Sequence, residues 1–190
     1  MSSTRTSALV LIIIAAAATR LLPHPPNVTS ITALALFGGA CFSNRWIAFA
    51  VPLLALAASN LVLGVYWNWS FMAWQPHLWV QYVAFAMIVA LGFLLRERRS
   101  VWRVASVTLA SSVLFFVVTN LAEWAFQAWY PKTADGLVAA YVAAIPFFRN
   151  SLLGDFGYVA LLFGGMKLLE TKFPSLRAPA AHATTAWGQT

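Results

Sequence analysis

Long apolar segments, separated by short polar connectors, follow one another through most of this 190-residue chain. Hydrophobic residues make up 61% of the sequence and charged residues 9%, whereas soluble domains contain about 45–50% and about 25%. A soluble domain of this length cannot bury so much apolar surface. Since a continuous apolar segment can satisfy its backbone hydrogen bonds within lipid only as a helix, the chain is predicted to be an all-α, polytopic membrane protein.

Six apolar segments are predicted to form transmembrane helices, and a seventh segment is predicted to lie at the membrane interface. A helix needs about 20 residues to cross a bilayer, so the second segment is expected to be embedded among its neighbours or extended by its flanks. Residues 137–148, which contain Pro146, are too few to cross and are predicted to form a short interfacial or re-entrant helix before the last span. The six predicted spans are residues 8–22, 31–42, 46–66, 78–95, 104 to about 129, and 152–169.

The two ends of the chain differ from its middle. Residues 1–173 are predicted to form a single transmembrane domain. Residues 174–190 contain Pro, Ala, Thr, Ser and Gly without apolar periodicity and are predicted to be a disordered tail. The first apolar segment also resembles a signal peptide, with small residues at 15–17 as a cleavage site; we favour a retained helix, because a polytopic protein needs no removable signal.

The net charge of +7 comes from basic residues that lie mainly in the connectors between apolar segments. There they would face lipid headgroups, so no nucleic-acid partner is predicted, and membrane lipids are. Lys and Arg concentrate in cytoplasmic connectors, and the predicted spans place nine basic residues on one side and three on the other. Both termini are therefore expected in the cytoplasm. The larger group is Arg5, Arg45, Arg96, Arg98, Arg99, Arg103, Lys167, Lys172 and Arg177, and the smaller is Arg20, Lys132 and Arg149.

No motif of an enzyme is present in the sequence. There is no phosphate-binding loop, no nucleophile elbow and no zinc-protease motif, and the single Cys41 and three scattered histidines have no metal-site spacing. We therefore predict no catalytic residues, no cofactor and no metal.

A few polar residues stand inside the apolar segments, where each ionised side chain costs about 2.5–3.5 kcal/mol on insertion scales. Asn120, Glu123 and Trp124 can share one helical face suited to gripping a polar ring compound, although Glu123 can equally be a carboxylate that reaches the outer interface. Asp155 is predicted either to line a wet cavity or to form an internal ion pair with Arg149.

The uncharged loop between residues 66 and 79 is rich in tryptophan and includes Trp79. It is predicted to be either an aromatic lid over a flat ligand or part of the interfacial belt of aromatic side chains that membrane proteins share.

Several longer motifs resemble a known family. They are Arg-Leu-Leu-Pro-His-Pro-Pro-Asn at 20–27, Ala-Leu-Ala-Leu-Phe-Gly-Gly-Ala at 33–40, Tyr-Pro-Lys-Thr at 130–133, the stretch from 141 to 150, and Leu-Gly-Asp at 153–155. Together they resemble an uncharacterised bacterial membrane family that is related to the substrate-binding S-components of energy-coupling-factor (ECF) transporters. At Ser59-Asn60 the chain departs from the Ser-Asp of such sequences.

The resemblance implies a subunit of the bacterial inner membrane that binds a vitamin or related micronutrient for uptake. It also implies as partners a transmembrane coupling protein and two ATPase subunits. The alternatives are a structural or assembly membrane protein without a ligand and, with less support, a lipid-modifying enzyme with Glu123 and Asp155 as its acid and base. The predicted substrate-binding residues are His24, Asn27, Asn60, Trp79, Asn120, Glu123, Trp124, Asn150 and Asp155.

Overall fold

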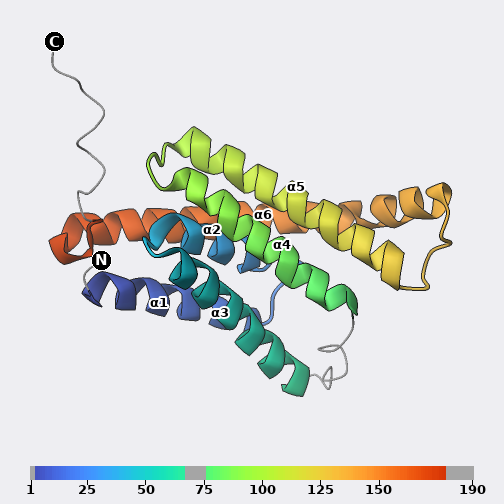
Figure 1. Cartoon of the computed structure of the whole chain (residues 1–190), viewed down its shortest axis with the longest axis horizontal. Coiled ribbons are helices and arrows are strands. Elements are labelled where there is room, and N and C mark those ends of the chain that lie inside the picture. The colour runs from blue at the N-terminus through green and yellow to red at the C-terminus, as the bar shows by residue number, and fades with distance from the viewer. Residues whose placement is uncertain (1–2, 67–75, 179–190) are drawn as a thin grey trace, which may run out of the picture.

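The computed structural model describes residues 3–66 and 76–178, and this part of the chain is entirely helical (Figure 1). Because its regular elements are helices and none is a strand, the all-α prediction is confirmed. The elements are α1 (Ser3–Ala18), η1 (Thr19–Leu21), α2 (Ile31–Cys41), α3 (Arg45–Tyr66), α4 (Pro76–Gly92), η3 (Phe93–Leu95), α5 (Val101–Phe126), α6 (Ala134–Lys172) and η4 (Pro174–Leu176), where η marks a short 3-10 helix.

Four of the helical segments are long and apolar enough to cross a membrane. Large apolar side chains cover their outer surfaces, as Val65 (74% exposed) and Leu168 (65% exposed) illustrate. A helical membrane protein explains this surface, because lipid is the solvent that tolerates it. The four segments are Ser3–Leu21, Arg45–Val65, Val101–Phe126 and Ala134–Lys172, while Ile31–Cys41 and Trp79–Leu95 are shorter apolar helices.

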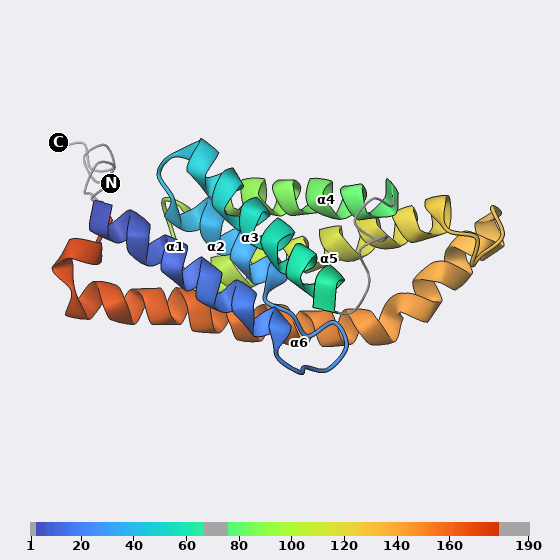
Figure 2. The same ribbon diagram turned by 90° about the horizontal axis from the view of Figure 1, so that it is seen from below.

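The short helix α2 is the centre of the bundle. All eleven of its residues are buried, and it packs against α1, α3, α4, α5 and α6. Figures 1 and 2 both show it enclosed by longer helices. Of the two predictions for this segment, the embedded helix is therefore the one that the structure confirms, and neighbours rather than lipid surround its surface.

Two glycines allow α2 and α4 to lie unusually close together. A Cβ atom on Gly39 would lie 2.1 Å from the Val89 carbonyl oxygen, and one on Gly92 would lie 2.5 Å from the Leu36 carbonyl oxygen. Real side chains do not make contacts this short. The backbones can therefore approach only because both residues lack a side chain, as is common where membrane helices pack through small residues.

Two arginines hold the C-terminal end of α2, where the last carbonyl groups of a helix lack partners within it. Arg96 donates from Nε to the Gly39 carbonyl (3.0 Å) and from Nη2 to the Phe42 carbonyl (2.8 Å). Arg99 donates from Nη2 to the Ala40 carbonyl (2.8 Å). A buried helix end is thereby satisfied by side chains from the α4–α5 turn.

We expect Arg96→Ala to lower the free energy of unfolding by about 2 kcal/mol, because it removes two hydrogen bonds from a charged donor and leaves two carbonyl groups without their partner. Thermal unfolding in mild detergent measures the change. Arg98→Ala is the matched control, since Arg98 is exposed and lies in the same turn. Equal midpoints for the two variants would contradict the capping role of Arg96.

The last helix differs from the prediction. Residues 137–148 do not form a separate interfacial helix, because α6 runs without a break from Ala134 to Lys172 with Pro146 inside it. Figure 2 shows the first part of α6 at an angle to the rest. A proline within a helix removes one backbone hydrogen bond and bends the axis, and here the helix continues beyond the bend. At 39 residues and about 1.5 Å per residue, α6 is far longer than the apolar core of a bilayer requires.

The two ends of the described chain are joined. The buried guanidinium of Arg5 on α1 forms an ion pair with Glu170 on α6 (2.7 Å) and donates to the Leu176 carbonyl. At the start of the predicted tail, Pro174–Leu176 form η4, and Leu176 is buried against the core. The remainder of the predicted tail, residues 179–190, lies outside the described residues.

The N-terminus of α1, the start of α3, the α4–α5 turn and the end of α6 gather at one end of the bundle (Figure 1). The larger group of basic residues belongs to these segments or their neighbouring turns. Arg20, Lys132 and Arg149 belong to the other half of the bundle. The two groups of basic residues that the sequence predicts on opposite sides of the membrane therefore also lie in opposite halves of the folded bundle.

Candidate functional site

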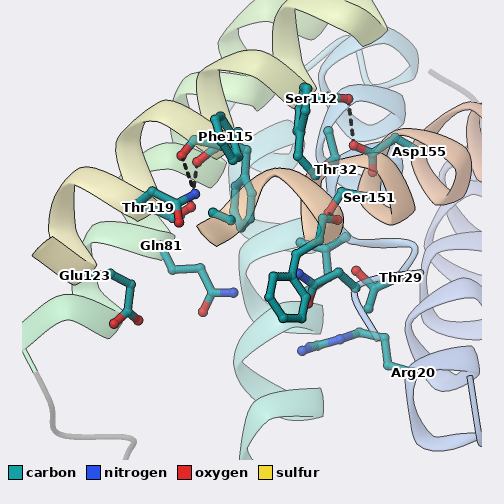
Figure 3. Close-up of a pocket in the computed structure, with 17 residues that line it drawn as sticks. Arg20, Thr29, Thr32, Gln81, Ser112, Phe115, Thr119, Glu123, Ser151 and Asp155 are labelled. Carbon is teal, nitrogen blue, oxygen red and sulfur yellow. Dashed lines mark hydrogen bonds between the residues drawn. The ribbon is translucent and has the colours of Figure 1, made fainter. Parts of the chain in front are cut away.

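A cavity of about 370 Å³, lined by both polar and apolar side chains, opens in the half of the bundle away from the basic end. Figure 3 shows its labelled side chains converging from η1, the 22–30 loop, α2, α4, α5 and α6. Its volume falls in the range of about 300–1,000 Å³ that is usual for small-molecule sites. Its lining residues are Arg20, Asn27, Thr29, Ile31, Thr32, Gln81, Ser112, Phe115, Phe116, Thr119, Asn120, Glu123, Ala144, Phe147, Phe148, Ser151 and Asp155.

Asp155 on α6 is the most deeply buried carboxylate of the cavity (4% exposed). Its Oδ2 accepts a hydrogen bond of 2.7 Å from Ser112 Oγ on α5, and Thr32 lies beside it (Figure 3). Arg149 is exposed and forms no ion pair with Asp155. The predicted internal ion pair is therefore wrong: the residues are six positions apart, and their side chains point to different surroundings.

Arg20, on η1 just after α1, is the cationic residue of the cavity lining. Its Nη1 donates to Ser59 Oγ and to Asn60 Oδ1 (3.0 Å), and Asn60 Nδ2 in turn donates to the Tyr82 hydroxyl (3.1 Å). This network links three helical segments, η1, α3 and α4. Asn60, at the Ser-Asn departure, acts here as a neutral acceptor for an arginine.

The loop between η1 and α2 closes against the cavity. Asn27 adopts a left-handed conformation (φ 61°), which asparagine tolerates better than most residues. Asn150 Nδ2 on α6 donates to the Pro26 carbonyl (3.1 Å). Gly154 lets this loop approach α6, because a Cβ there would lie 3.2 Å from both Val28 Cα and Thr29 N.

Aromatic rings form the apolar wall. Phe116 and Phe148 stack at a centroid distance of 4.6 Å with a tilt of 38°, and Phe115 and Phe147 also line the space. Flat apolar side chains beside a few placed polar groups are typical of sites that bind small organic molecules.

The predicted site residues are partly brought together. Asn27, Asn120, Glu123 and Asp155 line the cavity, while Asn60 stands behind Arg20 and positions it. Glu123 and Asp155 lie on opposite sides of the cavity in Figure 3.

The other four predicted residues do not line the cavity. His24 is exposed, with Nδ1 3.0 Å from the Pro25 carbonyl oxygen, and Asn150 is used to fasten the loop. Trp124 donates from Nε1 to the Pro131 carbonyl (2.9 Å) in the α5–α6 connection, so its ring does not line the cavity beside Asn120 and Glu123. Trp79 is 55% exposed, beside Tyr82; most of the predicted aromatic lid, residues 67–75, lies outside the described residues.

Sequence reasoning missed several polar residues of the cavity, among them Thr32, Gln81, Ser112, Thr119 and Ser151. Hydroxyl groups inside an apolar helix usually bond to their own backbone, as Ser112 does with the Thr108 carbonyl (3.0 Å), so they carry little signal. Arg20 did carry a sequence signal, because a cation at the edge of a membrane span needs a partner.

The described part of the chain is a helical bundle with four helices long and apolar enough to cross a membrane and a cavity of mixed polar and apolar lining. The chain belongs to the family described as "Family of unknown function (DUF6580)", whose model matches residues 1–176. No curated protein and no solved structure matches the chain.

Proposed function

We propose that this protein is a substrate-binding membrane subunit for the uptake of a small molecule. The observation that carries the proposal is the 370 Å³ cavity, in which charged, amide, hydroxyl and aromatic side chains meet inside a membrane bundle. Polar groups placed at membrane depth are costly and usually serve a ligand or one another. A vitamin or related micronutrient fits the resemblance to ECF S-components, and so do a coupling protein and two ATPases as partners.

The basic end of the bundle gives the proposal a direction. Lys and Arg concentrate on the cytoplasmic side of membrane proteins, so the basic end faces the cytoplasm together with both termini. The cavity, in the opposite half, then opens towards the outside of the bacterial inner membrane. A binding subunit for uptake requires this direction.

Native mass spectrometry of the gently purified protein tests the binding role. We expect a co-purifying small molecule that is lost in Ala144→Trp, because Ala144 lines the cavity and an indole ring would fill much of it. Ala160→Trp is the matched control: it makes the same substitution in the same helix at an exposed position and should retain the molecule.

An empty protein at every setting, together with equal thermal stability of both variants, would reject the binding role. It would favour a structural membrane protein in which the Ser112–Asp155 hydrogen bond only joins α5 to α6. A molecule retained by Ala144→Trp would also count against the cavity as its site.

A further inference from the structure

Within the described part of the chain, Arg20 forms no hydrogen bond and no ion pair with an acidic side chain. Both acceptors of its Nη1, Ser59 Oγ and Asn60 Oδ1, are uncharged. Nε is buried without a hydrogen-bond partner, and within residues 3–66 and 76–178 no carboxylate forms an ion pair with this guanidinium. Arg20 is half-buried, and a charge withdrawn this far from water normally has an ionic partner.

The position of the guanidinium is nevertheless fixed. A long side chain at the end of a membrane helix ordinarily extends to the interface, where its charge is hydrated. Arg20 is instead held by α3 through Ser59 and Asn60, and Asn60 is held by Tyr82 of α4. Nη2 makes no hydrogen bond and is not buried, so it is the nitrogen open to the cavity. The network therefore presents a cation to the space where a ligand would lie.

The other walls have the opposite character. Figure 3 shows Arg20 reaching into the cavity from one side, with Asp155 and Glu123 on two other sides. A ligand that suits all three needs an anionic group at one place and hydrogen-bond donors at others. A carboxylate is opposite in charge to a guanidinium and, like it, planar, so the two groups can form paired hydrogen bonds. The cavity also contains two acidic side chains, and these repel a singly charged carboxylate less than a phosphate dianion.

We propose that the cavity binds a small organic carboxylate, whose anionic group lies against the Arg20 guanidinium while its hydrogen-bond donors face Asp155 and Glu123. The phenyl rings of Phe116 and Phe148 then cover the apolar part of the molecule. This assignment deepens the proposed function and depends on it for the biological role of the carboxylate. The anion site itself stands on the geometry of Arg20.

Acetate is the probe for this site, because it is the smallest organic carboxylate with a methyl group and needs no further contacts. In nitrogen-15 NMR of the purified protein, Arg20→Gln assigns the Arg20 Nε–H signal by its loss. We expect acetate to shift this signal in the unsubstituted protein with saturation, while acetamide in matched sodium chloride leaves it unchanged. The signal of exposed Arg98 is the internal control and should show no saturating shift.

A shift at Arg20 that only follows Arg98, or that acetamide reproduces, would overturn the assignment. The result is separable from the test of the proposed function. A neutral molecule found in the cavity, with its retention unchanged by Arg20→Gln, would keep the binding role and reject the carboxylate. Saturable acetate binding in a protein that never carries a small molecule would keep the anion site and reject the binding role.

Discussion

Gly39→Ala is expected to lower the free energy of unfolding by about 3 kcal/mol, at the upper end of what overpacking usually costs. The added methyl group would lie 2.1 Å from the Val89 carbonyl oxygen, and the atom it meets is backbone rather than the end of a flexible side chain. The helices α2 and α4 would have to move apart. This would disturb the whole bundle, because all the longer helices pack against α2. Thermal unfolding in mild detergent measures the loss.

Gly164→Ala provides the matched control, because a Cβ atom at Gly164 meets nothing within 4 Å. This variant should unfold at or slightly above the midpoint of the unsubstituted protein, since alanine favours a helix over glycine by about 1 kcal/mol. Gly92→Ala should resemble Gly39→Ala. A Gly39→Ala protein as stable as the Gly164→Ala protein would show that α2 and α4 do not need this close approach.

The sequence predicted the helical segments well where apolar length alone decides. Segment 46–66 lies within one residue of α3, because its long apolar run and flanking polar residues define both ends. For segment 31–42 the sequence allows two alternatives, since burial by protein and burial by lipid favour the same apolar residues. Only the surrounding helices decide that α2 is embedded.

The error at α6 has a different cause. Pro146 and the short apolar stretch before it suggested a separate element, because proline usually ends a helix in water. Inside a membrane a broken helix leaves backbone groups without water to satisfy them, so a bend costs less than an end. Proline at such a position is therefore weak grounds for a helix boundary.

For the site, the sequence identified acidic and amide residues that line the cavity, but it did not identify the residues to which the site's polar side chains are hydrogen-bonded. Asp155, Glu123 and Asn120 were found because their presence in apolar segments has a high energetic cost. Their partners come from other helices: Ser112 stands 43 positions from Asp155, and Ser59 stands 39 positions from Arg20. Residues so far apart meet only through the fold, and a single sequence does not contain that information.

Asp155→Leu should weaken retention of the bound molecule about 100-fold, which corresponds to about 3 kcal/mol. It removes the buried carboxylate that lines the cavity and leaves the Ser112 hydroxyl with its bond to the Thr108 carbonyl. Stability should change little or rise, because replacing a buried polar group by an apolar one of similar volume is often neutral or stabilising, and hydrogen bonds between membrane helices contribute only about 0.6 kcal/mol on average.

A large loss of stability without a separate loss of retention in Asp155→Leu would identify Asp155 as a structural residue. If Asp155→Leu lowers the unfolding midpoint strongly and the retained fraction falls only in proportion to the folded protein, the Ser112–Asp155 hydrogen bond serves to join α5 to α6. Asp135→Leu is the control, since Asp135 is an exposed acid at the start of the same helix and its loss should leave retention unchanged. Asp155→Asn adds a graded step: it keeps an oxygen acceptor for Ser112 but removes the charge, so retention should fall about tenfold while the midpoint stays in place.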